Sequence, residues 1–129
     1  MKSPIGDNAQ PRHAIKKRVL VLDDNRTLAE ILAMSLNAMG FEATAYALPG
    51  EALRQIHHFD ILVSDYHMPE MTGLEVAKRA HELGWRGSLF LMSGHRDKLT
   101  EVTGHPLLCS FLQKPFSGSE LGTVLRTLD

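Results

Sequence analysis

Five short strand-like runs constrain the fold of this chain more than any other feature. The clearest is ILVS at residues 61–64, which leads directly into Asp65. A run without polar alternation is typical of a strand that is buried on both faces, as in a parallel sheet covered by helices. The other runs are RVLVL (18–22), EATAY (42–46), SLFLM (88–92) and CSFLQ (109–113).

Segments with helical periodicity separate these runs. Apolar residues at helical spacing predict a helix over about 28–39, and Pro49 opens a short second one. A third helix begins near Gly73, and residues 121–128 place apolar side chains at i, i+3, i+4 and i+7. Segment 96–104 predicts a weak helix, because its threonines and valine have low helix propensity. Alternating strands and helices with right-handed crossovers predict an α/β fold, a parallel sheet with helices on both faces.

Composition limits the class of protein. The chain has 129 residues, 43% hydrophobic and 22% charged, as expected for one globular domain. Its apolar runs fall far short of the ~20 residues of a membrane span. A single cysteine, Cys109, excludes an internal disulfide, so we expect a cytoplasmic location. We expect residues 1–17 to form a flexible basic tail and 18–129 the domain. The tail lacks aromatic residues and periodicity, so we expect no direct nucleic-acid or membrane partner.

Polar residues follow four of the predicted strands. Asp23 and Asp24 follow the first strand, Asp65 the third, Ser93 the fourth and Lys114 the fifth. The carboxyl ends of parallel strands meet at one edge of a sheet, where ligands bind near a topological switch point. The five residues are therefore expected in one crevice.

Each of these residues also has an ordinary structural explanation. Asp24 or Asn25 can cap the next helix, Ser93 can cap the one after its strand, and Lys114 can be a surface ammonium. Caps and surface charges do not explain why acids, a hydroxyl and an ammonium gather at one edge.

The chemistry that suits this group is phosphoryl transfer. Three adjacent carboxylates cannot all stay charged without a cation, and Mg²⁺ prefers such oxygen ligands. One carboxylate can then act as a nucleophile toward phosphorus. Lys114 and the Ser93 hydroxyl can hold phosphoryl oxygens and offset their charge.

The motifs VLDDN, VSDYHMPEMTGLE, LMSGH and FLQKPF resemble, in order and spacing, the response-regulator receiver domain of bacterial two-component signalling, chemotaxis regulators included. The resemblance covers about residues 17–128. It implies a (βα)5 doubly wound, flavodoxin-like fold with its parallel strands in the order 2-1-3-4-5.

The resemblance also implies the roles of the acids. Asp65 matches the phosphoacceptor, which takes its phosphoryl group from a histidine kinase or a phosphotransfer protein. Asp24 matches a direct Mg²⁺ ligand, and Asp23 matches a ligand that acts largely through water. The backbone carbonyl of His67 matches the third protein contact to the metal.

A switch is implied as well. Ser93 matches the switch hydroxyl and Lys114 the lysine of the family, whose bond to the following proline is cis. Phe111 matches the switch aromatic, expected to rotate inward when Ser93 moves toward the phosphoryl group; alternatively it is a fixed core ring. Phosphorylation is expected to change the surface of the fourth helix (96–104), the fifth strand (109–113) and the fifth helix, where a downstream protein would bind.

His67 and His95 stand two residues after Asp65 and Ser93. In the family these positions flank the route of the hydrolytic water. We hypothesise that one or both histidines make phosphoryl loss pH-dependent between about pH 6 and 7.5, where histidine titrates. The alternative is that both are exposed and inert.

We therefore expect a single-domain response regulator that catalyses its own phosphorylation and dephosphorylation but has no independent turnover. Alternatively, the chain is a receiver domain excised from a multidomain response regulator or hybrid histidine kinase. A Mg²⁺-dependent aspartyl-phosphate phosphohydrolase of the haloacid dehalogenase type is a remote alternative, because those enzymes carry D-x-D after the first strand. A flavodoxin-like cofactor binder would need a Gly/Ser/Thr loop where this chain has DDNRT.

Overall fold

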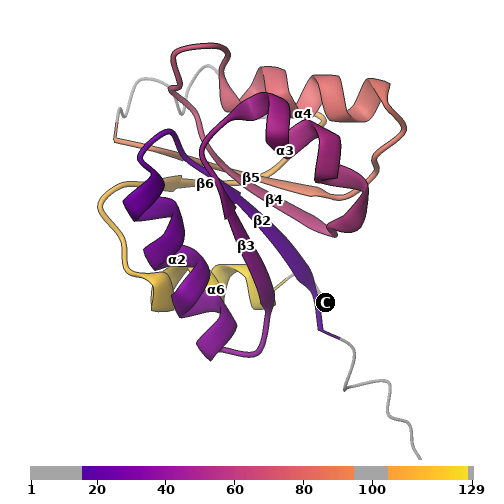
Figure 1. Cartoon of the computed structure of the whole chain (residues 1–129). Coiled ribbons are helices and arrows are strands. Elements are labelled where there is room, and N and C mark those ends of the chain that lie inside the picture. The colour runs from indigo at the N-terminus through magenta and orange to yellow at the C-terminus, as the bar shows by residue number, and fades with distance from the viewer. Residues whose placement is uncertain (1–15, 95–104, 128–129) are drawn as a thin grey trace, which may run out of the picture.

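The computed structural model describes residues 16–94 and 105–127, and its five strands are all parallel (Figure 1). The strands are β2 (Arg18–Leu22), β3 (Glu42–Tyr46), β4 (Ile61–Asp65), β5 (Ser88–Ser93) and β6 (Leu108–Gln113). The helices are α2 (Arg26–Ala38), α3 (Pro49–Gln55), the 3₁₀ turn η2 (Ile56–His58), α4 (Gly73–Glu82) and α6 (Gly118–Arg126). The predicted tail up to residue 15, the predicted helix 96–104 and His95 lie outside the described residues.

The strands are ordered β3-β2-β4-β5-β6. In chain order this is 2-1-3-4-5, so the predicted fold is confirmed. The chain moves outward from β2 to β3 and then crosses back to β4, which pairs with the other side of β2. The topological switch point therefore lies between β2 and β4, whose carboxyl ends carry the predicted acids.

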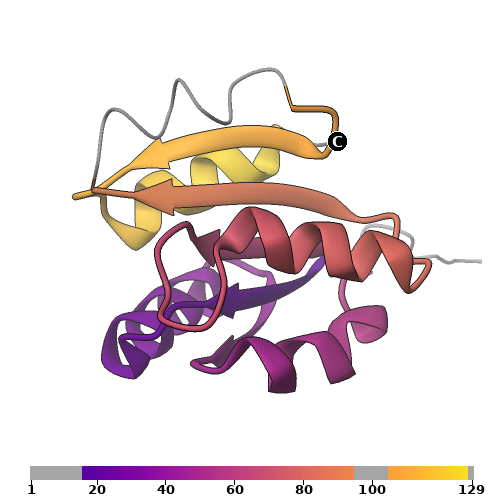
Figure 2. The same cartoon turned by 90° about the horizontal axis from the view of Figure 1, so that it is seen from above.

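Side chains alternate between two cores, one on each face of the sheet. On β2, Val19 and Val21 belong to one core and Leu20 and Leu22 to the other, and all four are fully buried. The first core packs under α2 and α6, and the second under α3 and α4. Figures 1 and 2 show these helix pairs on opposite faces of the sheet. Burial on both faces explains the apolar runs in the sequence.

The helices begin and end at identifiable signals. Asn25, one of the two predicted caps, is the N-cap of α2, and its side chain accepts from the Leu28 N–H at 3.1 Å. Thr72 before α4 and Ser117 before α6 each form a capping box with the glutamate three residues later. Gly84, with φ of +98°, ends α4 in a conformation that favours glycine.

Two strands end one residue later than the sequence predicted. Asp65 and Ser93 are the last residues of β4 and β5, because the backbone pairs Asp65↔Met92 and Ser93↔Gln113 extend the ladder. Both side chains are consequently fixed on the sheet instead of in a loop.

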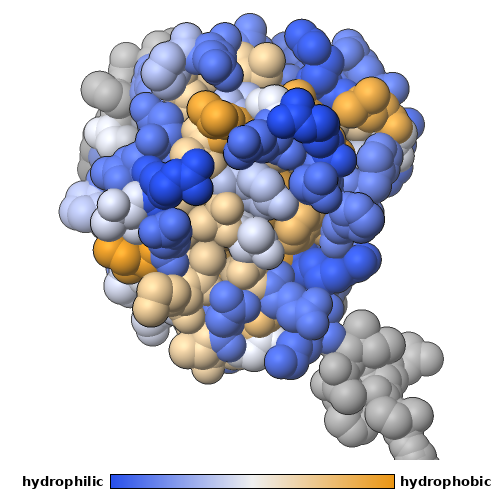
Figure 3. Space-filling model, in the orientation of Figure 1, coloured by the Kyte–Doolittle hydropathy of each residue, from blue (hydrophilic) through white to orange (hydrophobic). Residues whose placement is uncertain are grey.

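The face of the molecule seen in Figure 3 is mostly hydrophilic, with a weakly apolar area in its lower half and a few separate, more strongly apolar spots. No helix among the described residues is both long and apolar enough to cross a membrane.

Candidate metal and phosphoacceptor site

The carboxyl ends of β2 and β4 bring three carboxylates together. One oxygen from each of Asp23, Asp24 and Asp65 lies within 4.8 Å of the other two. Asp23 and Asp65 are buried, whereas Asp24 is exposed. Among the described residues this is the group of acids that could hold a metal ion.

Lys114 connects two of these acids. Its Nζ donates to Asp23 Oδ2 at 3.0 Å and lies 3.2 Å from Asp65 Oδ1. The residue follows β6, two strands away from β4, and its backbone N–H donates to the Ser93 carbonyl at 2.8 Å. The Lys114–Pro115 bond is cis, as the resemblance implies.

Asp23 is held by donors on both of its oxygens. Its Oδ1 accepts from the backbone N–H of Asn25 at 2.9 Å, while Oδ2 accepts from Lys114. Asp24 is exposed beside it. Asp23 therefore accepts hydrogen bonds from protein donors, whereas Asp24 lies on the solvent side of the site.

Burial and neighbouring charges act on Asp65 in opposite directions. Desolvation raises the pKa of its carboxyl, the charge of Lys114 lowers it in part, and the charge of Asp23 raises it further, so that the net shift is upward. Burial lowers the pKa of Lys114. The hydrogen bond from Lys114 to Asp23 and the charges of Asp65 and Asp23 outweigh burial, so the net effect is a raised lysine pKa. The lysine thus stays charged, and its single ammonium contacts two of the three carboxylates, those of Asp23 and Asp65.

A hard divalent cation fits this site. The donor set consists entirely of carboxylate oxygens, the ligands that Mg²⁺ prefers. Burial and the neighbouring acids disfavour the charge of Asp65 and raise its pKa despite Lys114, and a bound cation would offset this.

The other predicted site residues lie on or near this edge. Ser93 is fully buried at the end of β5. Phe111 is half-buried on β6, opposite Leu91, and packs against the core under α3 and α4. The imidazole of His67 is exposed and meets the ring of Tyr66 edge-on, with ring centroids 5.0 Å apart.

Three positions near the acids are not predicted by the sequence pattern. They are the Asn25 backbone N–H, the buried Ser64 hydroxyl, which donates to the Asp65 carbonyl, and Gly73, which packs against both Ser64 and Asp65. A polar residue inside the run ILVS was a visible signal for Ser64. The role of Gly73 depends on a backbone contact that no sequence pattern shows.

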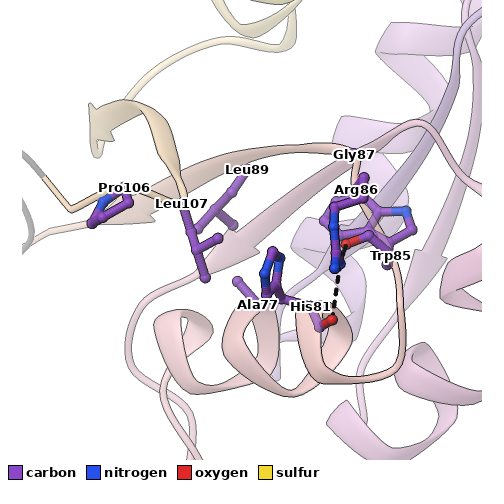
Figure 4. Close-up of a pocket in the computed structure, with 8 residues that line it drawn as sticks. All are labelled: Ala77, His81, Trp85, Arg86, Gly87, Leu89, Pro106 and Leu107. Carbon is purple, nitrogen blue, oxygen red and sulfur yellow. Dashed lines mark hydrogen bonds between the residues drawn. The ribbon is translucent and has the colours of Figure 1, made fainter.

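The described residues also enclose hollows away from the acids. Figure 4 shows one of about 180 Å³, in which Arg86 Nη1 donates to the His81 carbonyl at 2.9 Å. Leu89 and Leu107 line it, so it lies at the amino ends of β5 and β6, opposite the acidic edge. Trp85 forms part of its wall and donates from Nε1 to the Phe59 carbonyl at 2.8 Å, which gives that ring a structural role.

Comparison with known proteins agrees with this geometry. A family model described as the response regulator receiver domain matches residues 19–126. The two-component response regulator ARR11 of Arabidopsis thaliana is 32% identical over 109 residues, which cover 81% of this chain and 21% of the relative. The transcriptional regulatory protein FixJ of Bradyrhizobium diazoefficiens is 29% identical over 121 residues, 87% of this chain and 56% of the relative. The chain thus spans between a fifth and just over half of these relatives.

Two solved structures are similar over nearly their whole length. Chemotaxis protein CheY4 of Vibrio cholerae superposes with a TM-score of 0.79 at 25% identity, covering 89% of this chain and 100% of that one. Response regulator TrrA of Thermotoga maritima, solved in complex with Mg²⁺-BeF, gives a TM-score of 0.75 at 25% identity, with 88% and 99% covered.

Proposed function

The chain belongs to the response regulator receiver domain family, and we propose that it is a phosphorylation-dependent signalling switch with Asp65 as its phosphoacceptor. The observation that carries the proposal is the set of three carboxylates within 4.8 Å of one another, with Lys114 bridging Asp23 and Asp65. This arrangement supplies a nucleophile, a fixed cation and a set of metal ligands at one sheet edge.

Mg²⁺ is the proposed cofactor, held by Asp24 and Asp65 directly, by Asp23 through water and by the backbone carbonyl of His67. When bound, it neutralises carboxylate charge and polarises phosphoryl oxygens. Asp23 has both oxygens engaged by protein donors, which supports its indirect role. The similar protein TrrA was solved with Mg²⁺-BeF, which supports the choice of metal.

In the proposed reaction, a carboxylate oxygen of Asp65 attacks the phosphorus of the donor. The new O–P bond forms as the bond from phosphorus to the leaving group breaks, and the leaving group departs with that electron pair. The Lys114 Nζ lies 3.2 Å from Asp65 Oδ1, so its ammonium can bind a phosphoryl oxygen and stabilise the negative charge that develops on it. The Ser93 hydroxyl would donate to a second phosphoryl oxygen.

The switch follows from the added charge, roughly −1.5 to −2 per phosphoryl group. We propose that Ser93 moves toward it and that Phe111 turns into the space released. Phe111 is half-buried at the edge of a core, where rotation displaces fewer neighbours than at a fully buried position. Amide exchange should then differ in segment 96–104, β6 and α6 between the free protein and a beryllofluoride complex. Identical exchange in all three would refute the switch.

The proposed partners are a sensor histidine kinase or phosphotransfer protein as donor, and a protein that binds the surface of segment 96–104, β6 and α6. The relatives extend beyond the matched region, so the chain acts either as a single-domain regulator or as part of a longer one. The side chains of His67 and His95 are proposed to tune phosphoryl loss.

Acetyl phosphate and Mg²⁺, followed by intact mass measurement, test the proposal. We expect a gain of about 80 Da in the wild type, as for one phosphoryl group, and no gain in Asp65→Asn. Unmodified wild-type protein would refute the proposed function. Rapid turnover of many phosphate esters would instead support an aspartyl-phosphate phosphohydrolase.

A further inference from the structure

Ser64 places a hydroxyl in the middle of an otherwise apolar sheet. The residue is fully buried on β4, the central strand, between Leu22 of β2 and Leu91 of β5. A buried hydroxyl is costly unless it forms a hydrogen bond. Here its Oγ donates to the backbone carbonyl of the next residue, Asp65, at 3.0 Å. The hydroxyl therefore holds the main chain of the phosphoacceptor itself.

Gly73, the first residue of α4, packs against the same hydrogen bond between Ser64 and the Asp65 carbonyl. A Cβ added to Gly73 would lie 2.5 Å from the Asp65 carbonyl oxygen, and 2.8 Å from both Ser64 Oγ and Leu91 Cδ2. These distances are well inside van der Waals contact. Because the Asp65 carbonyl is backbone, it cannot rotate out of the way as a flexible side chain can. Glycine is required here for space, so that α4 can begin directly against Asp65.

Two backbone hydrogen bonds fix the ends of the loop between these elements. Gly73 donates from its N–H to the Tyr66 carbonyl at 2.9 Å, and Tyr66 donates to the Met92 carbonyl at 2.7 Å. The capping box of Thr72 then fixes the start of α4. The Gly73 N–H thus closes the base of the loop that contains His67 by binding the carbonyl of Tyr66, the residue that follows Asp65.

We infer that Ser64 and Gly73 are positioning residues for Asp65, fixing its main chain and the base of the metal-side loop so that its carboxylate points at the phosphorus. This inference rests on the proposed function. Neither residue touches the reacting atoms; both act through the Asp65 carbonyl. A misplacement of about 1 Å at a reacting group can cost on the order of 100-fold in rate, so small backbone shifts matter.

Gly73→Ala is the direct test, with Gly50→Ala as its matched control. Gly50 is the second residue of α3, and a Cβ there would approach only Arg54 Nη1, at 3.9 Å. Both variants add one methyl group near the start of a helix. We expect phosphorylation by acetyl phosphate, followed by intact mass, to slow by on the order of 10- to 100-fold in Gly73→Ala. Gly50→Ala should keep the wild-type rate.

Ser64→Ala and Gly122→Ala separate positioning from stability. Ser64→Ala removes the hydrogen bond without adding volume, and we expect a roughly two- to tenfold slower reaction. Gly122→Ala places a methyl group 2.3 Å from Met39 Sδ, so the flexible end of that side chain must move, which changes the packing of α6 on α2, away from Asp65. The variant should shift the urea midpoint but retain the wild-type rate while folded.

Apparent Mg²⁺ affinity, measured by titration calorimetry without any phosphodonor, gives a second readout. We expect it to be weaker in Gly73→Ala than in Gly50→Ala. If Gly73→Ala does not fold, Ser64→Ala decides. Wild-type rates and affinities in the folded variants, or equal slowing in Gly122→Ala, would overturn the inference. Failure of the wild type to react would instead overturn the proposed function.

Discussion

Replacing Asp65, the proposed phosphoacceptor, by asparagine should stabilise the metal-free protein. The carboxylate is buried, with its side chain 11% exposed, and desolvation raises its pKa above the ordinary 3.8 despite the nearby Lys114. Asparagine occupies nearly the same volume without the charge. The folded state of the variant therefore no longer contains a desolvated anion beside two other carboxylates.

The size of the effect follows from the distances. At an effective dielectric constant of about 20, Lys114 at 3.2 Å attracts the Asp65 charge by about 5 kcal/mol. Buried Asp23, within 4.8 Å, repels it by about 3.5 kcal/mol, and exposed, water-screened Asp24 by about 1 kcal/mol. These contributions nearly cancel, so desolvation decides the sign. Since Lys114 keeps its bond to Asp23, we expect Asp65→Asn to be more stable by about 1–2 kcal/mol at neutral pH.

This difference should depend on pH. A carboxyl whose pKa is higher in the folded than in the unfolded state binds a proton more tightly when folded, so its ionisation costs stability. The cost is absent below the unfolded pKa of 3.8 and grows as the pH rises through the folded pKa. The advantage of Asp65→Asn should accordingly be largest near about pH 7 and shrink toward about pH 4.

Urea unfolding in the presence of a chelator measures this prediction. Trp85, the single tryptophan, is buried and reports on unfolding through its fluorescence. The expected shift corresponds to roughly 3–8 °C in melting temperature. Added Mg²⁺ should stabilise the wild type more than the variant, because it binds the folded state through Asp65. A less stable variant at neutral pH, or an advantage that does not change with pH, would refute the reasoning.

Three further substitutions test the packing and the charges. Lys114→Met leaves Asp23 without its ammonium partner and should lower the free energy of unfolding by about 2–3 kcal/mol, measured in urea. This difference from the wild type should vanish as the pH rises above 10.5 through the raised lysine pKa, because the wild-type lysine then loses its charge. A difference that persists at that pH would contradict the ion pair as its cause. Gly118→Ala places a methyl group 2.2 Å from the Ser35 Cβ and should lower the free energy of unfolding by about 1–3 kcal/mol. An unchanged melting temperature would instead show that α6 can shift away from α2 at no cost. Gly84→Ala, at φ of +98°, meets no steric obstacle but should still cost about 1–2 kcal/mol through backbone strain alone; a neutral result in urea unfolding would speak against that conformation.

Much of the fold could be predicted from the sequence because the three inner strands, β2, β4 and β5, are buried on both faces. The runs at 18–22, 61–64 and 88–92 have no polar alternation, which favours a parallel sheet, and the helical spacing between them is regular. The ends of the strands were harder to predict. Asp65 and Ser93 continue their ladders through backbone hydrogen bonds, to which the polarity of their side chains gives no guide.

The grouping of the site residues could be predicted for a similar reason. Parallel strands bring their carboxyl ends to one edge, so Asp23, Asp65 and Lys114 were expected together, and the structure places them within hydrogen-bonding or ion-pair distance. The detailed contacts could not be predicted. The Asn25 N–H that binds Asp23 and the approach of Gly73 to the Asp65 carbonyl depend on backbone geometry, which residue types alone do not specify.

We propose that Asp65, and neither of its acidic neighbours, receives the phosphoryl group. Borohydride reduction of the protein after incubation with acetyl phosphate and Mg²⁺ tests it most directly, because hydride converts an aspartyl phosphate into homoserine while leaving free carboxylates unchanged. Peptide mapping should find homoserine at position 65 and aspartate at positions 23 and 24. Homoserine at either of those two positions, or an unaltered Asp65 in protein that carries the phosphoryl group, would contradict the account.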